Sequence, residues 1–238
     1  SLLREDIPGQ HVDGLTGLKS REYLRNELPR HFSEFRAQAK RMALLLVNID
    51  HLSWVNDRLG QPRGDRLLKA AAGLVLDNIR EGDIAIRFGG EEMLVVFGGD
   101  LNAGITLGER LRQAQERGLK HGDSMKDVLA IAEAEKDPCG TFSVGVIDAT
   151  AIPDLAPALD RVQQSLRHAK RSRNTVVCFD PARAGQGLEP FSSFAEYRQA
   201  RPAAVPPRRA GPGSAGPAGS VTPASPAFAS QEKPGSTT

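Results

Sequence analysis

The amino-acid sequence predicts an α/β domain that contains one antiparallel hairpin. Short apolar runs typical of strands alternate along the chain with stretches whose apolar residues recur at helical spacing. Two of the strand-like runs meet at a pair of glycines, Gly89 and Gly90, and this arrangement indicates a hairpin. The order of the elements is therefore that of an α/β protein.

The part of the domain before the hairpin is expected to contain a helix, a strand and a second helix. Residues 20–39 have apolar side chains at helical spacing, with Ser20 suited to be the N-cap and Pro29 at the position of a kink. Residues 42–49 form a continuous apolar run, as expected of a strand that is covered on both faces. Residues 64–79 again show helical spacing.

The hairpin and four further elements complete the domain. The run IAIRFGGEEMLVVF, residues 84–97, holds two strands, and we expect its glycines to supply positive φ angles at the turn. The later elements are expected to be a helix at 103–117, a strand at 141–147, a helix at 154–171 and a strand at 175–179. Residues 118–140 fit a helix or a strand equally well, and neither is assigned.

A sharp change of composition marks the last part of the chain. Residues 201–238 hold eight of the 16 prolines and a single aromatic residue, Phe228, which is too little apolar surface to offset the entropy of ordering. We expect this Pro/Gly/Ser-rich tail to be disordered. Residues 182–200 form a transition segment that either docks onto the domain through its aromatic side chains or remains a loose linker.

The domain itself is expected to span residues 13–181, preceded by an N-terminal linker at 1–12. Because the first residue is serine and not methionine, we expect an upstream region to be missing from this chain.

Composition and charge argue against several classes of protein. The 238 residues are 39% hydrophobic and 25% charged, which suits one domain of common size with an appendage. A net charge of +2 gives no reason to expect a nucleic acid polymer as partner, and no apolar run approaches the roughly 18–20 residues that span a bilayer. Cys139 and Cys178 have neither a zinc-site spacing nor a disulfide framework. We therefore expect a cytoplasmic protein without a membrane segment in this chain.

The hairpin carries the strongest chemical signal. Paired glycines allow the backbone to approach a phosphate closely, and the adjacent carboxylates of Glu91 and Glu92 can present oxygen ligands to Mg²⁺. Taken alone, GGEE is equally compatible with an ordinary hairpin whose acids are solvated.

The surroundings of the hairpin resemble the bacterial GGDEF family, whose domains make or sense cyclic di-GMP. FGGEEM is similar to the signature turn of the family, DGLTGL at 13–18 to its opening DxLTGL turn, and FSVGV at 142–146 to its SIGV strand. NIDHLSWVNDRLGQPRGDRLL at 48–68 resembles the DIDxFKxINDxxGHxxGDxxL segment. AKRSRN at 169–174 is similar to the closing AKxxGRN but one residue shorter. Because these matches occur in the family's order, the chain is identified as a member.

This resemblance implies a fold and an activity. The fold is a palm-like one, a central and mostly antiparallel sheet covered by helices, related to the palms of class III nucleotidyl cyclases and polymerases. Active members bind one GTP per domain, and two domains face each other to join two GTP molecules into cyclic di-GMP. The resemblance therefore implies GTP or cyclic di-GMP as ligand, Mg²⁺ as cofactor and a homodimer.

The resemblance also implies roles for individual residues. Asn56 and Asp65 match positions that hydrogen-bond guanine, whose N–H groups a carboxylate can accept. Lys170 and Arg173 match cations on the triphosphate, although both are also compatible with a solvated basic helix end. The implied site further comprises Gly89 and Gly90 beside the GTP, Glu91 and Glu92 as catalytic residues, and Glu91, Glu92, Asn48 and the backbone of Ile49 around the metal.

Several positions depart from the family's pattern. Asn48 stands where the family has its first metal-binding aspartate, and an amide oxygen is a weaker ligand for Mg²⁺ than a carboxylate. The other departures are Ser53 for Lys, Gln61 for His, Met93 for Phe and Arg167 for Tyr. The guanine positions are kept while the metal and phosphate positions are changed, which favours binding over turnover, with Mg²⁺ binding weak or absent.

Arg80 and Asp83 form a second candidate site. Five residues separate Asp83 from Gly89, the placement of the family's RxxD inhibitory site for cyclic di-GMP. The planar fork of arginine suits guanine and phosphate edges, and aspartate accepts from guanine N–H groups. The alternative is an exposed turn after the 64–79 helix whose two charges are solvated.

Three hypotheses follow. The leading one is a catalytically degenerate GGDEF domain that binds cyclic di-GMP at Arg80 and Asp83. The first alternative is an active diguanylate cyclase in which Glu91, Glu92, Asp50 and backbone carbonyls still hold Mg²⁺. The second alternative is a dimerisation scaffold without a ligand.

Overall fold

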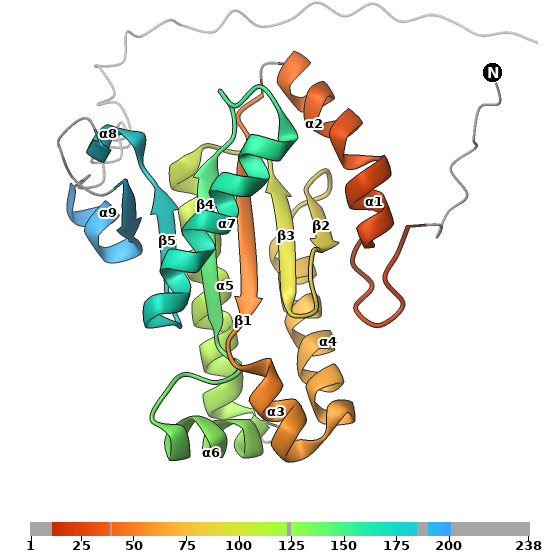
Figure 1. The fold of residues 1–238 in the computed structure, drawn as a ribbon, viewed down its shortest axis with the longest axis vertical. Helices are drawn as coiled ribbons and strands as arrows, with labels where there is room; N and C mark the ends of the chain where they lie inside the picture. The colour runs from red at the N-terminus through yellow and green to blue at the C-terminus, as the bar shows by residue number, and fades with distance from the viewer. Residues whose placement is uncertain (1–10, 39, 123–124, 185–189, 201–238) are drawn as a thin grey trace, which may run out of the picture. The chain divides into compact units, whose positions relative to one another are not determined.

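A six-stranded sheet with helices on both faces forms the domain (Figure 1). The computed structural model describes residues 11–38, 40–122, 125–184 and 190–200. The strands are β1 (Ala43–Ile49), β2 (Ile84–Arg87), β3 (Glu92–Phe97), β4 (Phe142–Asp148), β5 (Val176–Phe179) and β6 (Phe191–Ser193). Their order is β2-β3-β1-β4-β5-β6, and every neighbouring pair is antiparallel except β4 and β5. The expected mostly antiparallel sheet is confirmed.

Helices cover the two faces of this sheet. They are α1 (Arg21–Asn26), α2 (Leu28–Ala37), α3 (Leu52–Leu59), α4 (Gln61–Asn78), α5 (Leu101–His121), α6 (Lys126–Glu135), α7 (Leu155–Ser172), α8 (Pro181–Ala184) and α9 (Phe194–Ala200). In Figure 1, α7 crosses the front of the sheet while α4 and α5 lie behind it.

Strand β1 shows why a continuous apolar run was needed at the centre. Leu44 and Leu46 pack in a buried cluster with side chains of α2 and α7, whereas Leu45 and Val47 pack in the cluster that includes α4 and α5. Since side chains alternate along a strand, Asn48 projects to the same face as Leu46, toward α7. The position of one polar residue at the end of this strand is thereby set by the packing of its neighbours.

The first expected helix is two helices. The Ser20 side chain accepts a hydrogen bond from the Glu22 N–H, so Ser20 is the N-cap as predicted. The helix then breaks at Glu27, and Pro29 lies in the first turn of α2. Backbone N–H groups in the first turn have no acceptor within the helix, so the missing N–H of proline costs no hydrogen bond there. The kink expected at Pro29 is therefore a full break two residues earlier.

Elements between β1 and β4 also differ from expectation. Helix α3 was not expected, and α4 begins at Gln61, three residues before the predicted start. Gly60 separates the two helices with a φ of +82°, a conformation that glycine adopts without strain. The unassigned stretch 118–140 contains the last residues of α5 and the whole of α6.

The hairpin is present, but its glycines do not have the expected backbone. Neither Gly89 nor Gly90 has a positive φ, so that prediction is wrong. The reason is the length of the loop: residues 88–91 connect the strands, and the N–H groups of Phe88 and Gly89 both donate to the Glu92 carbonyl. A four-residue loop does not need the left-handed pair of a two-residue turn.

The transition segment docks onto the sheet in the part that the structure describes. Strand β6 pairs with β5, the Phe191 ring stacks on His168 with centroids 3.9 Å apart, and Tyr197 is buried in the core. The tail at 201–238 and residues 1–10 of the predicted linker lie outside the described residues.

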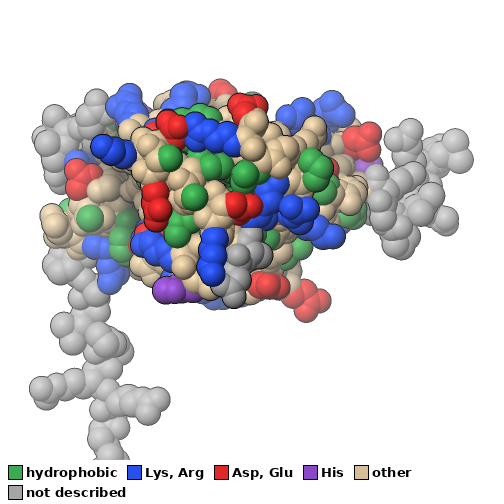
Figure 2. Space-filling view, turned by 90° about the horizontal axis from the view of Figure 1, so that it is seen from below, with side chains coloured by type: hydrophobic (Ala, Val, Ile, Leu, Met, Phe, Trp, Pro, Cys, Tyr) green, Lys and Arg blue, Asp and Glu red, His purple; other side chains and the backbone are tan. Residues whose placement is uncertain are grey.

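The surface and the helices bear on possible partners. Figure 2 shows one face of the molecule, on which basic and acidic side chains are interspersed. Within the described residues no helix is long and apolar enough to cross a membrane. Cys139 and Cys178 are both free and buried.

Candidate functional site

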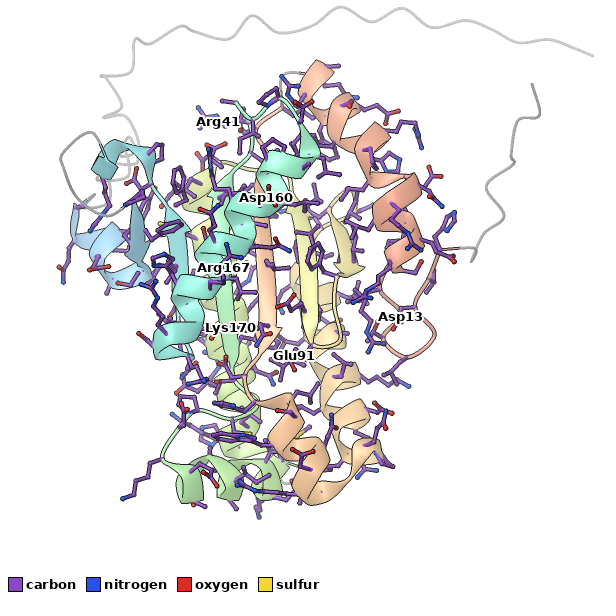
Figure 3. The ribbon with its side chains drawn as sticks, viewed as in Figure 1. Asp13, Arg41, Glu91, Asp160, Arg167 and Lys170 are labelled. Atoms are coloured by element: carbon purple, nitrogen blue, oxygen red, sulfur yellow. The ribbon has the colours of Figure 1, made fainter. Side chains whose placement is uncertain are left out.

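Strand β1, the hairpin loop and the last turn of α7 meet at a cavity of about 260 Å³. Figure 3 shows Lys170 on α7 and Glu91 on the hairpin near the same end of the sheet. The residues that line the cavity are Asn48, Asp50, His51, Ser53, Glu91, Lys170 and Arg173. The structure thus brings together the predicted metal position, one of the predicted acids and both predicted phosphate cations.

The two glutamates of the hairpin already have a cationic neighbour. The Lys170 Nζ lies 3.2 Å from Glu92 Oε1 and 4.0 Å from Glu91 Oε1. Burial raises the pKa of Glu91, Lys170 opposes that rise, and the charge of Glu92 adds to it. The acids and the lysine form one compact charged group at the mouth of the cavity.

Asn48 lines this cavity and has a buried oxygen without a hydrogen-bond partner among the described residues. The residue is 1% exposed, and this oxygen is its Oδ1. On β1 it pairs with Glu92 of β3 on one side and with Ser143 of β4 on the other. A buried polar atom without a partner is costly, so this oxygen is suited to receive a ligand atom.

The Asp50 carboxylate accepts hydrogen bonds from within the domain. The residue is 1% exposed, and the donors are the Thr141 hydroxyl at 2.7 Å, the Ser143 hydroxyl at 2.6 Å and the Asn174 N–H at 3.1 Å. Burial raises the pKa of Asp50 despite these hydrogen bonds. Asp50 ties the loop after α7 to the end of β1, so three hydrogen bonds already engage the carboxylate that the active-cyclase hypothesis counts as a metal ligand.

We expect Asp50→Ala to lower the free energy of unfolding by about 2 kcal/mol, because two buried hydroxyls and the half-buried Asn174 N–H lose their acceptor. Urea unfolding followed by circular dichroism measures the change. Asp57→Ala, at an exposed position of α3, is the control and should alter stability by less than about 0.5 kcal/mol. Equal stabilities of the two variants would contradict this role of Asp50.

Arg173 is held at the rim of the cavity by an acid. Its Nη1 donates to Asp137 Oδ2 at 2.8 Å, and His51 Nε2 lies 3.1 Å from the same oxygen. Arg173 has a φ of +53° and Asn174 a φ of +41°, conformations that are unfavourable for arginine and better tolerated by asparagine. The loop that is one residue shorter than the family's pattern therefore stores backbone strain beside the cavity.

The residues predicted to read guanine lie on α3 and α4. The Asn56 Oδ1 is buried and has no partner in the described part of the chain. A Cβ at Gly64 would come within 2.9 Å of the Asn56 Cγ, so glycine is required for this side chain to rest on α4. Asp65 is the residue after Gly64 and is half-buried. Neither residue lines the cavity described above.

The turn between α4 and β2 holds Arg80 and Asp83. The Asp83 carboxylate accepts from the Arg80 N–H at 2.9 Å and from the Gly98 N–H at 2.9 Å. The Arg80 guanidinium is exposed and lies 5.8 Å from the centroid of the Phe97 ring. The turn is therefore exposed at Arg80, as predicted, but Asp83 is half-buried and shapes the backbone.

Residues 10–176 match the family described as diguanylate cyclase, GGDEF domain. The chain belongs to the GGDEF family. It is also 30% identical over 172 residues to the response regulator PleD of Caulobacter vibrioides, a match that covers 70% of this chain and 35% of that protein. With the diguanylate cyclase DgcP of Pseudomonas aeruginosa the identity is 38% over 104 residues, 43% of this chain and 16% of that protein.

Solved structures of GGDEF domains have the same fold. The GGDEF domain of DgcB from Caulobacter crescentus, determined in complex with cyclic di-GMP, aligns with a TM-score of 0.59 and 24% identity over 75% of this chain and 96% of that one. The diguanylate cyclase SiaD of Pseudomonas aeruginosa, in complex with its activator SiaC, aligns with a TM-score of 0.59 and 27% identity over 71% of this chain and 62% of that one.

The family places this GGDEF domain in cyclic di-GMP signalling. The chain spans between 11% and 35% of the length of the curated relatives compared. They include cyclases and also the cyclic di-GMP phosphodiesterase NbdA, so the name of a relative does not transfer an activity to this domain.

Three contributors to the site were not predicted. Asp137 pairs with Arg173 and His51, and Thr141 and Ser143 hold Asp50. Asp137 falls in the stretch that could not be assigned, and no spacing in the sequence links it to Arg173. Ser143 belongs to the FSVGV strand of the GGDEF pattern, but the pattern did not predict that its hydroxyl donates to Asp50.

Proposed function

We propose that this GGDEF domain binds cyclic di-GMP at Arg80 and Asp83 and turns over GTP weakly or not at all. The observation that carries the proposal is the turn itself: Asp83 fixes its backbone by accepting from two N–H groups, and the Arg80 guanidinium is left exposed. A rigid turn presents the planar fork of arginine to guanine or phosphate edges at low entropic cost.

The state of the catalytic cavity supports weak turnover. Asn48 supplies an amide oxygen where the family has a carboxylate, and Ser53 removes a lysine. Both remaining cations are paired, Lys170 with Glu92 and Arg173 with Asp137. Phosphoryl transfer depends on positioned cations, and losing one such element commonly costs on the order of 10²–10³ in rate.

The residues present fit Mg²⁺ poorly. Within the described residues no group of three or more His, Cys, Asp or Glu side chains is arranged to hold a metal. Glu91, Glu92, the unpartnered Asn48 Oδ1 and the Ile49 backbone are the atoms that would hold it, and there the ion would neutralise phosphate charge.

We expect Asn48→Asp to raise Mg²⁺ affinity about fivefold or more, roughly 1 kcal/mol, because it adds an anionic ligand beside the hairpin acids. Calorimetric titration with MgCl₂ measures the change. Asn26→Asp, which adds the same charge at an exposed end of α1, is the control. An unchanged Mg²⁺ affinity in Asn48→Asp would show that residue 48 is not a metal position.

Titration of cyclic di-GMP into the wild-type protein tests the binding half of the proposal. We expect saturable binding. GTP, if it binds, is expected to use Asn56, Asp65, Lys170 and Arg173 beside Gly89 and Gly90. Failure of cyclic di-GMP to bind would refute the proposal. Failure of both nucleotides would favour the scaffold hypothesis, in which the domain acts only by forming a homodimer.

The competing function is an active diguanylate cyclase. The cyclases among the relatives favour it, and Glu91 and Glu92 are retained. The engagement of Asp50 by three internal donors weakens it, because one of the ligands it requires is already in use.

A further inference from the structure

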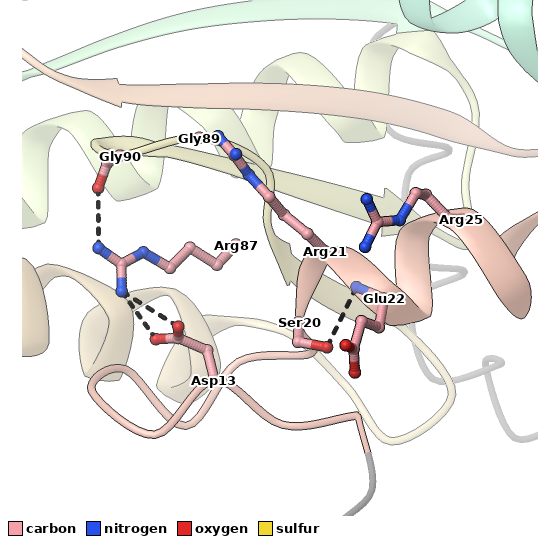
Figure 4. Close-up of a pocket in the computed structure, with 8 residues that line it drawn as sticks. All are labelled: Asp13, Ser20, Arg21, Glu22, Arg25, Arg87, Gly89 and Gly90. Carbon is pink, nitrogen blue, oxygen red and sulfur yellow. Dashed lines mark hydrogen bonds and ion pairs between the residues drawn. The ribbon is translucent and has the colours of Figure 1, made fainter.

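A second and larger cavity lies beside the hairpin. Its volume is about 490 Å³, compared with about 260 Å³ for the catalytic cavity. Figure 4 shows the residues that line it, which come from the opening turn, helix α1, the end of β2 and the hairpin loop. They are Asp13, Ser20, Arg21, Glu22, Arg25, Arg87, Gly89 and Gly90.

Three arginines and two acids set the charge of this cavity. The Arg87 Nη1 donates to both Asp13 oxygens, at 3.0 and 3.1 Å, and Thr16 donates to Asp13 as well. Partial burial by itself would raise the pKa of Asp13, but the hydrogen bonds from Thr16 and Arg87 lower it. Asp13 is thus an anion at neutral pH whose carboxylate is engaged by Arg87 and Thr16.

The other two arginines retain donors for a ligand. Among the described residues, Arg21 uses only its Nε, which donates to the Phe88 carbonyl at 3.1 Å. Arg25 makes no hydrogen bond or ion pair within the described residues, although it lines the cavity. The remaining acid, Glu22, is 61% exposed and faces His11 at 3.8 Å. The cavity therefore has a local excess of positive charge centred on Arg21 and Arg25.

The lining also selects the chemistry of a ligand. None of its eight residues is aromatic, so the cavity offers no surface on which a base would stack. Guanidinium forks match the oxygens of phosphate groups in bidentate geometry. We infer that this cavity binds the phosphate groups of an anionic ligand through Arg21 and Arg25, with the Asp13–Arg87 pair as its fixed wall.

A ligand at this position would lie against Gly89 and Gly90 of the hairpin loop. Arg87 Nη2 donates to the Gly90 carbonyl at 3.2 Å, and Arg21 holds the Phe88 carbonyl. Both arginines thus hold the loop that carries Glu91. This site shares no lining residue with the cavity of Lys170 and Arg173, and the turn of Arg80 and Asp83 does not line it. It shares only Gly89 and Gly90 with the implied GTP site, so it does not depend on cyclic di-GMP binding at Arg80 and Asp83.

Pyrophosphate is the probe that tests the inference, titrated at about 0.15 M salt so that weak surface attraction is screened. We expect Arg25→Gln to weaken its binding about threefold and Arg21→Gln/Arg25→Gln about tenfold. Arg25→Gln should keep the wild-type melting temperature, since Arg25 makes no hydrogen bond or ion pair with another described residue. Lys170→Gln/Arg173→Gln removes the cations of the catalytic cavity and should leave this binding in place.

Two results of these titrations would contradict the inference. No binding of pyrophosphate to the wild type, or binding that depends on Lys170 and Arg173 but not on Arg25, would overturn the inference. If GTP displaces pyrophosphate in an Arg25-dependent manner, the phosphate source is a nucleotide; if it does not, the source is a free polyphosphate. Cyclic di-GMP affinity should be the same in Arg25→Gln and in the wild type, which keeps this result distinct from the test of the RxxD site.

Discussion

Gly145→Ala is expected to destabilise the domain by about 4 kcal/mol or more. Gly145 lies on β4 against α7, where an added Cβ would sit 2.7 Å from the Val162 carbonyl oxygen and 2.9 Å from the Leu166 Cα. These are backbone atoms, so the clash is relieved only if α7 moves away from the sheet. Thermal unfolding followed by circular dichroism should show a melting temperature lower by roughly 10 °C.

Gly118→Ala is the matched control. Gly118 is exposed on α5, and nothing lies within 4 Å of an added Cβ. Alanine in a helix is better than glycine by roughly 0.5–1 kcal/mol, so this variant should be slightly more stable than the wild type. Equal melting temperatures of Gly145→Ala and Gly118→Ala would contradict the close contact between α7 and β4. That contact also places Lys170 over the hairpin acids.

The sheet and its long helices were predictable because their packing leaves a periodic trace. The run at 42–49 predicted β1, and the structure shows that its residues alternate between two buried clusters. The glycine pair predicted the hairpin, since glycines between two apolar runs mark a turn in the sequence. Helix α3 was missed because it is only eight residues long and lies within a motif that was assigned by its function.

The sequence predicted those features of the candidate site that depend on the type of each residue, such as its charge, but not those that depend on its partners. Glu91, the two predicted phosphate cations and Asn48 do converge at one cavity. Which acid has a free carboxylate depends on partners far away in the sequence: Asp50 is engaged by Thr141, Ser143 and Asn174. The Asp83 carboxylate is engaged for the same reason, because it accepts from the N–H of Gly98, which lies 15 residues away. Pairings of this kind have no periodicity and cannot be seen in one sequence.

Arg80→Ala is expected to weaken cyclic di-GMP binding at least tenfold. Charge-assisted hydrogen bonds contribute about 1.5–3 kcal/mol, and about 1.4 kcal/mol corresponds to a factor of ten. The side chain is exposed, and its described contact is with the Phe97 ring, so the variant should remain folded. Arg66→Ala, at an exposed position of α4, removes the same charge and should bind like the wild type. Calorimetric titration compares the three proteins.

Asp83→Ala should also weaken binding, but it is a less direct test. Its carboxylate accepts from the N–H groups of Arg80 and Gly98, so the variant loses the shape of the turn together with a guanine acceptor. Of the two variants, only Arg80→Ala is expected to stay as well folded as the wild type. GTP binding, if present, should survive Arg80→Ala, and equal cyclic di-GMP affinities of Arg80→Ala and the wild type would refute the RxxD site.

The most direct test of the central claim, binding with little or no turnover, is the rate at which the purified wild-type chain converts GTP and Mg²⁺ into cyclic di-GMP, with Asn48→Asp assayed in parallel. We expect the wild-type rate to fall far below the roughly 1 s⁻¹ typical of working enzymes. Asn48→Asp should bind Mg²⁺ more tightly without restoring a normal rate, because Ser53 and the short 169–174 loop are unchanged. Production of cyclic di-GMP by the wild type at roughly 1 s⁻¹ or faster would contradict the account and identify the domain as an active cyclase.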